Sequence, residues 1–332
     1  MRRSAFESWY PIVFSKDIKP NKIYPFSLLG EPLVIYRDKN NKVVCLQDKC
    51  AHRSTPLSLG RINKGIIECK YHGWQFNNIG SCIKIPALKK DEKLPPKACV
   101  PCKKVIEKHN LVWVYIGEHS SNSIDTKFEN QFNCANDKST RFDFTIDLDI
   151  PYELMIENLL DPSHLPFTHH GTLSKRKKAA PISFEIKKSK EIISGVATGF
   201  EKKADKKTSF YFVPPHTVYF DVEFSNKGMR QIHYCIPLTS KKMRLNTIFY
   251  YKNMPWLKFI PFINAIQKRM SRKIVVQDIA MLTGQDNNIN LGAKPWDQAI
   301  NADKLALNYR RWLEQEIKFK SPWFKGFITD VS

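Results

Sequence analysis

Short apolar or alternating runs, separated by Gly, Asn, Asp and Pro, dominate the first third of the chain. Such runs are typical of β-strands joined by tight loops, because successive side chains of a strand point to opposite faces. The pattern predicts an all-β domain over residues 1–118, with strands at residues 32–36, 42–46, 66–69 and 111–116. Residues 119–140 are polar and lack periodicity, which predicts a linker.

The remainder of the sequence, residues 141–332, predicts a second domain that combines a sheet with helices. Residues 152–160 have a helical pattern. Runs rich in β-branched and aromatic residues then predict an antiparallel sheet, with strands at residues 192–200, 208–213, 217–224, 229–235 and 243–251. Helical patterns follow at residues 259–285 and 302–316. Strands followed by helices predict an α+β domain.

Composition narrows the class of protein. Hydrophobic residues make up 42% and charged residues 26% of the 332 residues, as in ordinary globular proteins. No stretch reaches the roughly 18 apolar residues of a transmembrane helix, and the N-terminus lacks the apolar core of a signal peptide. We therefore expect no integral membrane segment. The most apolar stretch, residues 254–266, is interrupted by Pro and Lys and is compatible with core packing or with peripheral membrane contact.

The chain is strongly basic, with 53 Lys and Arg against 32 Asp and Glu, a formal charge of +21. A charge of this size favours acidic partners, although a Lys-rich proteome would explain it equally well. Basic runs at residues 175–178 and 201–207 are not accompanied by a zinc-finger spacing or an aromatic–basic RNA motif. We therefore expect no binding of nucleic acid.

Two cysteines and two histidines recur at a metal-binding spacing. Cys50-x-His52 and Cys69-x2-His72 are separated by sixteen residues. Two thiolates and two imidazoles can bind Zn²⁺ or a [2Fe–2S] cluster. Eight cysteines in a chain of this length do not suggest a disulfide framework, so a reducing compartment with metal-bound thiolates is expected.

The residues around these ligands resemble a Rieske domain. The similar segments are CAHRSTPLSLG from residue 50, CKYHGWQF from residue 69 and G-x-C-x-x-IP from residue 80. The resemblance favours the cluster over zinc, and it implies that the cysteines hold one iron and the histidines the other. A further C-x-x-C, Cys99 to Cys102, could be redox-active, but no helix start follows it, which favours a structural role.

A second group of possible ligands lies between residues 157 and 170, where three histidines stand near two carboxylates. Two histidines and one carboxylate form the facial triad of non-haem Fe(II) oxygenases, although a solvated polar loop would show the same composition. Asp278 is a candidate for the carboxylate, because residues three and four positions away on its predicted helix are all apolar: Ile274, Val275, Met281 and Leu282. A carboxylate within an apolar stripe needs a partner or a metal.

The segment NLLDPSHLPFTH, residues 158–169, resembles the N-x2-D-x2-H-x4-H motif of Rieske oxygenase catalytic domains. The resemblance names His164 and His169 as iron ligands, with His170 as the alternative for the second. The third ligand of this family lies in a late helix, here at Asp278, with Asp286 as the alternative.

The same resemblance assigns two further catalytic residues. Asp161 would bridge a cluster histidine of one subunit to an iron histidine of its neighbour, which implies a head-to-tail homotrimer. Asn158 lies one turn earlier and would shape the iron pocket. The resemblance also implies a helix-grip, START-like catalytic domain at residues 141–332 after the Rieske domain.

Within the family, the sequence is most similar to the pheophorbide a oxygenase group, which includes chlorophyllide a oxygenase. The similar segments are ENLLDPSHLPFTHHGTL from residue 157 and ADKLALNYRRWLEQE from residue 302. Plant members continue into a cysteine pair and a membrane anchor, whereas this sequence ends at Ser332. We therefore expect a soluble, cytoplasmic enzyme of bacterial type.

The resemblance implies an oxygenase that takes two electrons from an external reductase or ferredoxin and uses O2 to hydroxylate, demethylate or ring-open a cyclic substrate, such as a chlorophyll-derived porphyrinoid. The alternatives are an electron-transfer protein that uses only the cluster, or the alpha subunit of a ring dioxygenase. Aromatic strand residues are candidates for the substrate pocket, although such residues more often form core: Phe210, Phe212, Tyr219 and Phe249.

Overall fold

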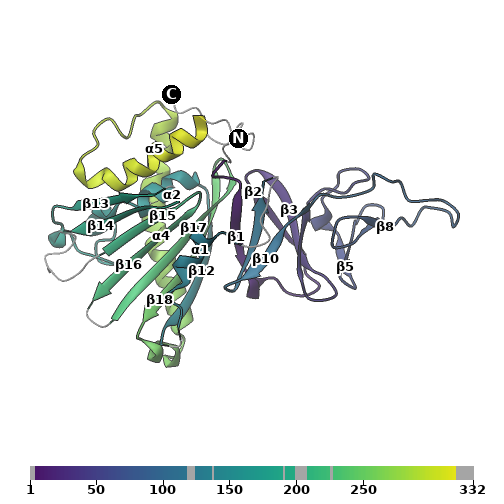
Figure 1. Ribbon diagram of the computed structural model, residues 1–332, viewed down its shortest axis with the longest axis horizontal. Helices are drawn as coiled ribbons and strands as arrows, with labels where there is room; N and C mark the ends of the chain where they lie inside the picture. Colours follow the sequence, from purple (N-terminus) through teal and green to yellow (C-terminus); the bar gives the residue numbers. More distant parts are fainter. Residues whose placement is uncertain are drawn as a thin grey trace. The chain divides into compact units, whose positions relative to one another are not determined.

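The computed structural model describes residues 4–117, 124–136, 138–189, 191–198, 208–224 and 227–318. They form two compact units (Figure 1). The N-terminal unit spans residues 7–124, and the C-terminal unit comprises residues 1–6 and 125–332. The predicted α+β class is confirmed. The functional boundaries at residues 118 and 140 stay predictions, and the described part of the predicted linker contains two short helices, α1 (Thr126–Glu129) and η3 (Asn130–Phe132).

Small antiparallel sheets make up the N-terminal unit, in the orders β1-β11-β10, β2-β3-β4-β9 and β5-β6-β7-β8. β11 is buried at every position because it is the central strand of its sheet. The strands are β1 (Ser8–Phe14), β2 (Tyr24–Leu28), β3 (Glu31–Arg37), β4 (Val43–Gln47), β5 (Arg61–Asn63), β6 (Ile66–Glu68), β7 (Gln75–Phe76), β8 (Cys82–Lys84), β9 (Cys102–Lys103), β10 (Val105–Lys108) and β11 (Leu111–Ile116), with short 3-10 helices η1 (Ser15–Asp17) and η2 (Leu57–Leu59).

The C-terminal unit is built on one seven-stranded antiparallel sheet, in the order β12-β18-β17-β16-β15-β14-β13. Each pair of neighbouring strands in this order runs antiparallel. The strands are β12 (Thr140–Leu148), β13 (Ser183–Lys188), β14 (Ile193–Thr198), β15 (Thr208–Val213), β16 (Thr217–Phe224), β17 (Lys227–Thr239) and β18 (Lys242–Lys252). The two strands at the edges of the sheet, β12 and β13, are the ones that the hydrophobic pattern did not predict.

Three helices cover one face of this sheet: α2 (Tyr152–Leu159), α4 (Ile263–Asn290), which crosses behind the sheet in Figure 1, and α5 (Lys304–Lys318). Val275 of α4 packs against the cluster formed by Phe142, Phe144 and Phe249. Phe212 contacts Tyr309 and Trp312 of α5 at ring-centroid distances of 4.8 and 4.9 Å. One row of paired residues on this face consists of Phe142, Phe249, Gln231, Phe220 and Phe210. The helices and the sheet thus enclose a layer rich in phenylalanine.

The opposite face of the sheet is covered in part by η3. The guanidinium of Arg230 donates to the backbone oxygens of Asn130 and Gln131, at 3.3 and 3.1 Å. Tyr219 lies on this face, below the Arg230 guanidinium. A substrate pocket on the helix-covered face therefore cannot include Tyr219, one of the four predicted pocket residues.

The helix predicted over residues 259–285 begins and ends later, at Ile263 and Asn290. Residues Pro255–Phe259 form a separate 3-10 helix, η6. Phe262 has a φ of 59°, in the left-handed region, so the right-handed α-helix can begin only after it. The hydrophobic pattern runs through this break because both segments present apolar side chains. No helix in the described part of the chain is both long and apolar enough to span a membrane.

Candidate metal centres

The turn that follows α2 sets the position of the first predicted iron ligand. Asp161 Oδ1 accepts a hydrogen bond from the backbone N–H of Ser163 at 2.8 Å, and Pro162 begins the 3-10 helix η4 (Pro162–His164). An Asp cap followed by proline is a strong signal for a helix start. His164 closes η4, and His169 directly follows the next short helix, α3 (Leu165–Thr168).

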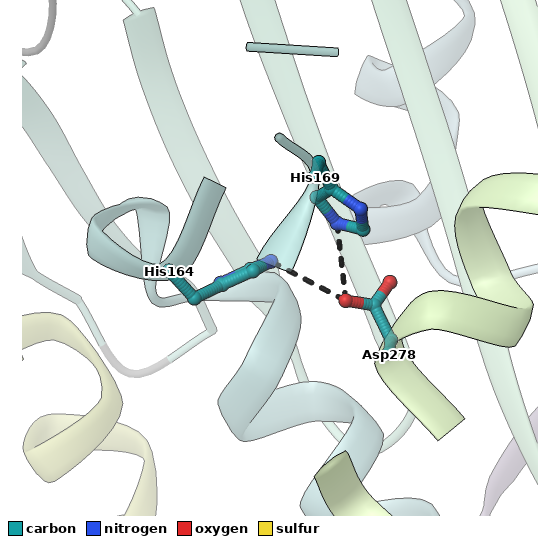
Figure 2. Close-up of side chains that lie close together, drawn as sticks. All are labelled: His164, His169 and Asp278. Carbon is teal, nitrogen blue, oxygen red and sulfur yellow. Dashed lines mark ion pairs between the residues drawn. The ribbon is translucent and has the colours of Figure 1, made fainter. Parts of the chain in front are cut away.

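His164, His169 and Asp278 meet at one point, although Asp278 is more than a hundred residues later in the chain (Figure 2). Asp278 Oδ1 lies 3.0 Å from His169 Nε2 and 3.5 Å from His164 Nε2. The possible ligand atoms all lie within 4.8 Å of one another. The side chains of His169 and Asp278 are only 1% and 9% exposed, so the site is nearly closed to water on their side.

The Nδ1 atom of each imidazole faces an oxygen that accepts hydrogen bonds. His169 Nδ1 lies 3.0 Å from Gln277 Oε1, and His164 Nδ1 lies 2.5 Å from the backbone oxygen of Asp161. The hydroxyl of Thr172 donates to the same Gln277 oxygen at 2.9 Å, which holds the amide in this orientation. These acceptors favour the proton on each Nδ1, and the Nε2 atom of a neutral ring then presents a lone pair.

These two lone pairs are directed at a carboxylate oxygen that has only lone pairs of its own. Within the described residues, Asp278 Oδ1 is buried and has no hydrogen-bond donor. Three electron-pair donors at one buried point need a positive charge between them, either a metal ion or a proton on His169 Nε2, which lies 3.0 Å from Asp278 Oδ1. Two imidazoles and one carboxylate suit non-haem Fe(II) and leave coordination positions open. The residues present therefore fit a mononuclear iron.

Protonation of the two imidazoles differs in the metal-free protein. Burial lowers the pKa of His164, which keeps this ring neutral and able to bind a metal. Burial also lowers the pKa of His169, but contacts with Asp278 and Gln277 outweigh this effect and raise it above the ordinary value. A metal must displace a proton from His169, so metal binding is expected to weaken as the pH falls.

The four predicted cluster ligands lie on two loops of the N-terminal unit. Cys50 and Cys69 are each 2% exposed and belong to one hydrophobic core, and their side chains are in contact. The rings of His52 and His72 are exposed, with centroids 4.5 Å apart. Trp74 stacks on His52 at 4.6 Å. Buried thiolates below two adjacent exposed imidazoles suit a [2Fe–2S] cluster with one iron inside and one outside.

Gly73 shows why the second loop needs glycine beside a ligand. Its φ is 70°, a conformation that other residues rarely adopt, and a Cβ there would lie 2.9 Å from Pro86 Cγ. The Gly73 N–H donates to the backbone oxygen of Cys69 at 3.0 Å, and the Cys69 N–H donates to Trp74. The tight turn thereby holds Cys69 and His72 on one loop tip.

The alternative ligands are engaged elsewhere. His170 is exposed, and its Nδ1 accepts a hydrogen bond from the Arg176 N–H at 3.3 Å. Asp286 forms an ion pair with Lys241 at 3.2 Å. Neither belongs to the group of three ligands. This placement favours His169 and Asp278, whose metal roles remain predictions.

The other predicted residues are placed as follows. Asp161 is half-buried, and its Oδ2 lies 3.9 Å from His164 Nδ1. Asn158 is half-buried on α2, and its backbone oxygen accepts from the Asp161 N–H. Cys99 and Cys102 are exposed free thiols, and the structural interpretation of the C-x-x-C stays a prediction.

The sequence did not identify two residues that contact the site, nor a third, buried histidine on the helix-covered face of the sheet. Gln277 and Thr172 orient His169, and only the adjacency of Gln277 to Asp278 could have indicated the first of them. The third is His233, in the middle of an apolar strand and on the helix-covered face. Its ring stacks on Phe220 at 5.1 Å and lies 6.5 Å from that of Phe249.

His233 is a buried, neutral hydrogen-bonding group. Burial lowers its pKa to about 3. Its Nδ1 is 3.1 Å from Thr247 Oγ1, while its Nε2 is buried without a hydrogen-bond partner among the described residues. Leaving such an atom unpaired costs about 1–3 kcal/mol. It lies beside Phe249, a member of the cluster against which Val275 of α4 packs.

Replacing Gln277 by Leu tests the orientation of His169. Gln277→Leu removes the acceptor for His169 Nδ1–H, so the ring can rotate or change tautomer. We expect the affinity for Fe(II) to fall about ten- to a hundredfold, the usual cost of losing such an outer partner. Gln285→Leu, on the same helix, is the matched control. Equal Fe(II) affinity of the two variants in a competitive chelator titration would contradict the assignment.

Comparison with protein families gives two matches, one in each part of the chain. Residues 8–104 match the Rieske [2Fe-2S] domain. Residues 148–318 match the vanillate O-demethylase oxygenase C-terminal domain. The first match makes the N-terminal unit a [2Fe–2S] domain, as the Cys and His spacing predicts.

Curated relatives include chlorophyllide a oxygenase of Chlamydomonas reinhardtii, 30% identical over 92% of this chain and 47% of the relative. Pheophorbide a oxygenase of Oryza sativa is 28% identical over 98% of this chain and 67% of the relative. The chain spans about half the length of the first of these relatives. Both are chloroplastic proteins, which gives no support to a bacterial cytoplasmic location.

Among solved structures, dicamba monooxygenase bound to dicamba superimposes with a TM-score of 0.79 at 18% identity, over 96% of this chain and 99% of that one. The likeness confirms the fold, with a Rieske domain before an antiparallel sheet and helices. The second family match covers residues 148–318, just over half of the 332 residues. The chain therefore belongs to the Rieske oxygenases, in the branch whose C-terminal domain is of the vanillate O-demethylase type.

Proposed function

We propose that this protein is a monooxygenase that inserts one atom of O2 into a cyclic organic substrate. In the balanced reaction, substrate R–H, O2, two electrons and two protons give R–OH and water. When the hydroxylated carbon is a methyl group bound to nitrogen or oxygen, the C–N or C–O bond then breaks, formaldehyde leaves, the hydroxyl proton passes to the nitrogen or oxygen, and the reaction is a demethylation. The electrons come from an external reductase or ferredoxin.

The observation that carries this proposal is the convergence of three lone-pair donors from His164, His169 and Asp278. Because both Nδ1 atoms face acceptor oxygens, the two Nε2 atoms are directed at Asp278 and are available to a metal once His169 loses its second proton. A structure of dicamba monooxygenase with the same fold contains non-haem iron, which supports iron as the metal. Bound Fe(II) would supply the open coordination positions at which O2 is activated.

The residues around the iron ligands have defined tasks in the proposed reaction. Gln277 and the backbone oxygen of Asp161 hold the two imidazoles in the ligating tautomer. Phe220 and Phe249 offer flat apolar surfaces to a ring. His233, neutral because of its low pKa, offers one hydrogen bond to a polar atom of that ring. A flat, uncharged ring with a carbonyl, hydroxyl or ring nitrogen is therefore the substrate class that suits these groups.

The proposal includes an assembly. Asp161 lies at the start of η4, beside His164, and its Oδ2 forms no hydrogen bond within the described residues. Such a carboxylate oxygen can accept a hydrogen bond from an exposed imidazole of a second copy, such as His52 or His72. A head-to-tail homotrimer would repeat this contact three times and close the ring. The cytoplasmic location stays a prediction.

A single-turnover experiment tests the activity. Anaerobic, chemically reduced protein loaded with Fe(II) is mixed with ¹⁸O2 and a panel of porphyrinoids, methoxy-aromatics and N-methylated heterocycles, and products are identified by mass spectrometry. We expect one labelled oxygen atom in one product class. Labelled water formed in equal amount would account for the second oxygen atom.

Two other results would contradict the proposal. Two labelled atoms in a cis-diol would identify a ring dioxygenase. An empty iron site after ferrous reconstitution, in protein that keeps its cluster and delivers electrons to an acceptor, would identify an electron-transfer protein.

A further inference from the structure

An exposed apolar surface lies where the last strand of the sheet connects to α4. Trp256 and Phe259 of η6 are 52% and 80% exposed. Phe262 and Ile266, at the start of α4, are 84% and 55% exposed. Leu257 and Ile263 in the same segment point inward and pack against the phenylalanine core. The segment is thus anchored by some of its apolar residues and presents the others outward.

The outward residues follow one side of α4. In a helix of 3.6 residues per turn, Phe262, Ile266, Arg269 and Lys273 lie within about 60° of one another, on the side away from Asp278. The side chains on the opposite face are buried at Ser271, Asp278 and Leu282. The inner face of the helix therefore carries the predicted metal ligand. Its outer face carries exposed aromatic, aliphatic and basic residues.

Phe262 adds a second indication that this surface has a function. It is the N-cap of α4 in the left-handed region, with a φ of 59°. Bulky residues rarely adopt this conformation, in which Gly or Asn would be less strained. An aromatic residue that is both strained and 84% exposed contributes little to folding. Strain of this kind is commonly retained where it serves binding.

The charges around the apolar residues are of one sign. Residues 251–277 contain no Asp or Glu but six basic residues: Lys252, Lys258, Lys268, Arg269, Arg272 and Lys273. Except for Lys252, which pairs with Asp221, none of them forms an ion pair within the part of the chain that the structure describes. Exposed aromatic residues within an unpaired basic field match the interface of an anionic membrane, where the rings enter the headgroup layer and the cations meet lipid phosphates.

We propose that η6 and the first three turns of α4 form a docking surface for an anionic lipid bilayer. Trp256, Phe259, Phe262 and Ile266 insert between the headgroups, and Arg269 and Lys273 bind phosphate groups. The contact is peripheral, and it does not depend on the proposed oxygenase activity.

Vesicle co-sedimentation of the full chain tests this surface. The vesicles contain either phosphatidylcholine alone or phosphatidylcholine mixed with phosphatidylglycerol. We expect binding to the anionic vesicles that weakens as salt is added. Phe259→Ser with Phe262→Asn, where Asn tolerates the left-handed backbone, should weaken this binding at least about tenfold, because two large apolar side chains no longer insert. Arg269→Gln with Lys273→Gln should weaken it by about tenfold as well, through lost attraction to the anionic surface.

A matched control and a local probe keep the test specific. Leu291→Ser with Ile300→Ser removes two equally exposed aliphatic side chains elsewhere in the unit and should leave vesicle binding unchanged. Vesicles with brominated acyl chains should quench tryptophan fluorescence in the wild type and much less in Trp256→Phe. No binding by the wild type, or equal binding by the wild type and the Phe259/Phe262 variant, would overturn the proposal. An oligomer that dissociates in that variant, without vesicle binding by the wild type, would instead identify an interface between copies of the chain.

Discussion

Asp278→Ala is expected to lose the mononuclear iron and the oxygenase activity while it keeps the [2Fe–2S] cluster. Two imidazoles remain, and among the described residues no other carboxylate joins them in a group of possible metal ligands. Fe(II) affinity should fall by more than about a hundredfold, because losing a ligand costs more than losing a residue that only hydrogen-bonds to a ligand. The measurements are the iron content after ferrous reconstitution, the EPR spectrum of the reduced cluster and product formation in a single turnover.

Asp286→Ala is the matched control for this experiment. Asp286 lies on the same helix and pairs with Lys241, so its loss should leave iron content and product yield within about twofold, as for an exposed ion pair. Product formation by Asp278→Ala at the wild-type level would refute the ligand assignment. Loss of activity only in Asp286→Ala would move the third ligand to that position.

Asp161→Asn is expected to reduce turnover by about a hundredfold with both metal centres still loaded. The amide has the same size as the carboxylate and can still accept the hydrogen bond from the Ser163 N–H, so η4 should form. What disappears is the negative charge beside His164 and the proposed acceptor for a neighbouring subunit's imidazole. Stopped-flow absorption of the cluster should therefore show slower oxidation when prereduced protein meets O2 and substrate.

Ser163→Ala separates this electronic role from helix capping. The variant loses the hydroxyl that donates to Asp161 Oδ1 but keeps the carboxylate and its backbone donor. We expect cluster oxidation close to the wild-type rate. Similar rates in Asp161→Asn and the wild type would show that Asp161 is only the cap of η4.

The sequence predicted strands best where the apolar and aromatic residues of a segment are also the ones that the fold buries. Leu111–Ile116, Thr208–Val213 and Thr217–Phe224 are strands with the predicted ends, because each is apolar or aromatic on a buried surface and bounded by turns. β12 and β13 were missed because edge strands alternate with charged residues such as Asp143 and Glu185. The first turn of α4 was misplaced because Phe262 breaks the helix without breaking the apolar pattern.

The candidate site was predictable where ligands lie close together in the sequence, or where a ligand stands among apolar residues on one side of a helix. His164 and His169 follow a motif, and Asp278 was marked by its apolar neighbours. Spacing alone does not separate His169 from His170; the motif names His169, and the structure places His169, not His170, beside Asp278. His233 gave no signal, since a lone histidine within an apolar strand has the same pattern whether it faces a core or a ligand.

The continuity of α4 fixes a distance. The helix runs unbroken from Ile263 to Asn290, and Asp278 lies fifteen residues after its start, or about 22 Å along the axis at 1.5 Å per residue. With the start of the helix at a bilayer surface, the predicted iron ligand Asp278 would lie about this far along the helix from the lipid and outside the hydrocarbon interior. A lipophilic ring dissolved in the membrane would then have to leave the bilayer to react. It would travel only about the length of this part of α4. The rate at which lipid releases the substrate would contribute to the overall rate of turnover.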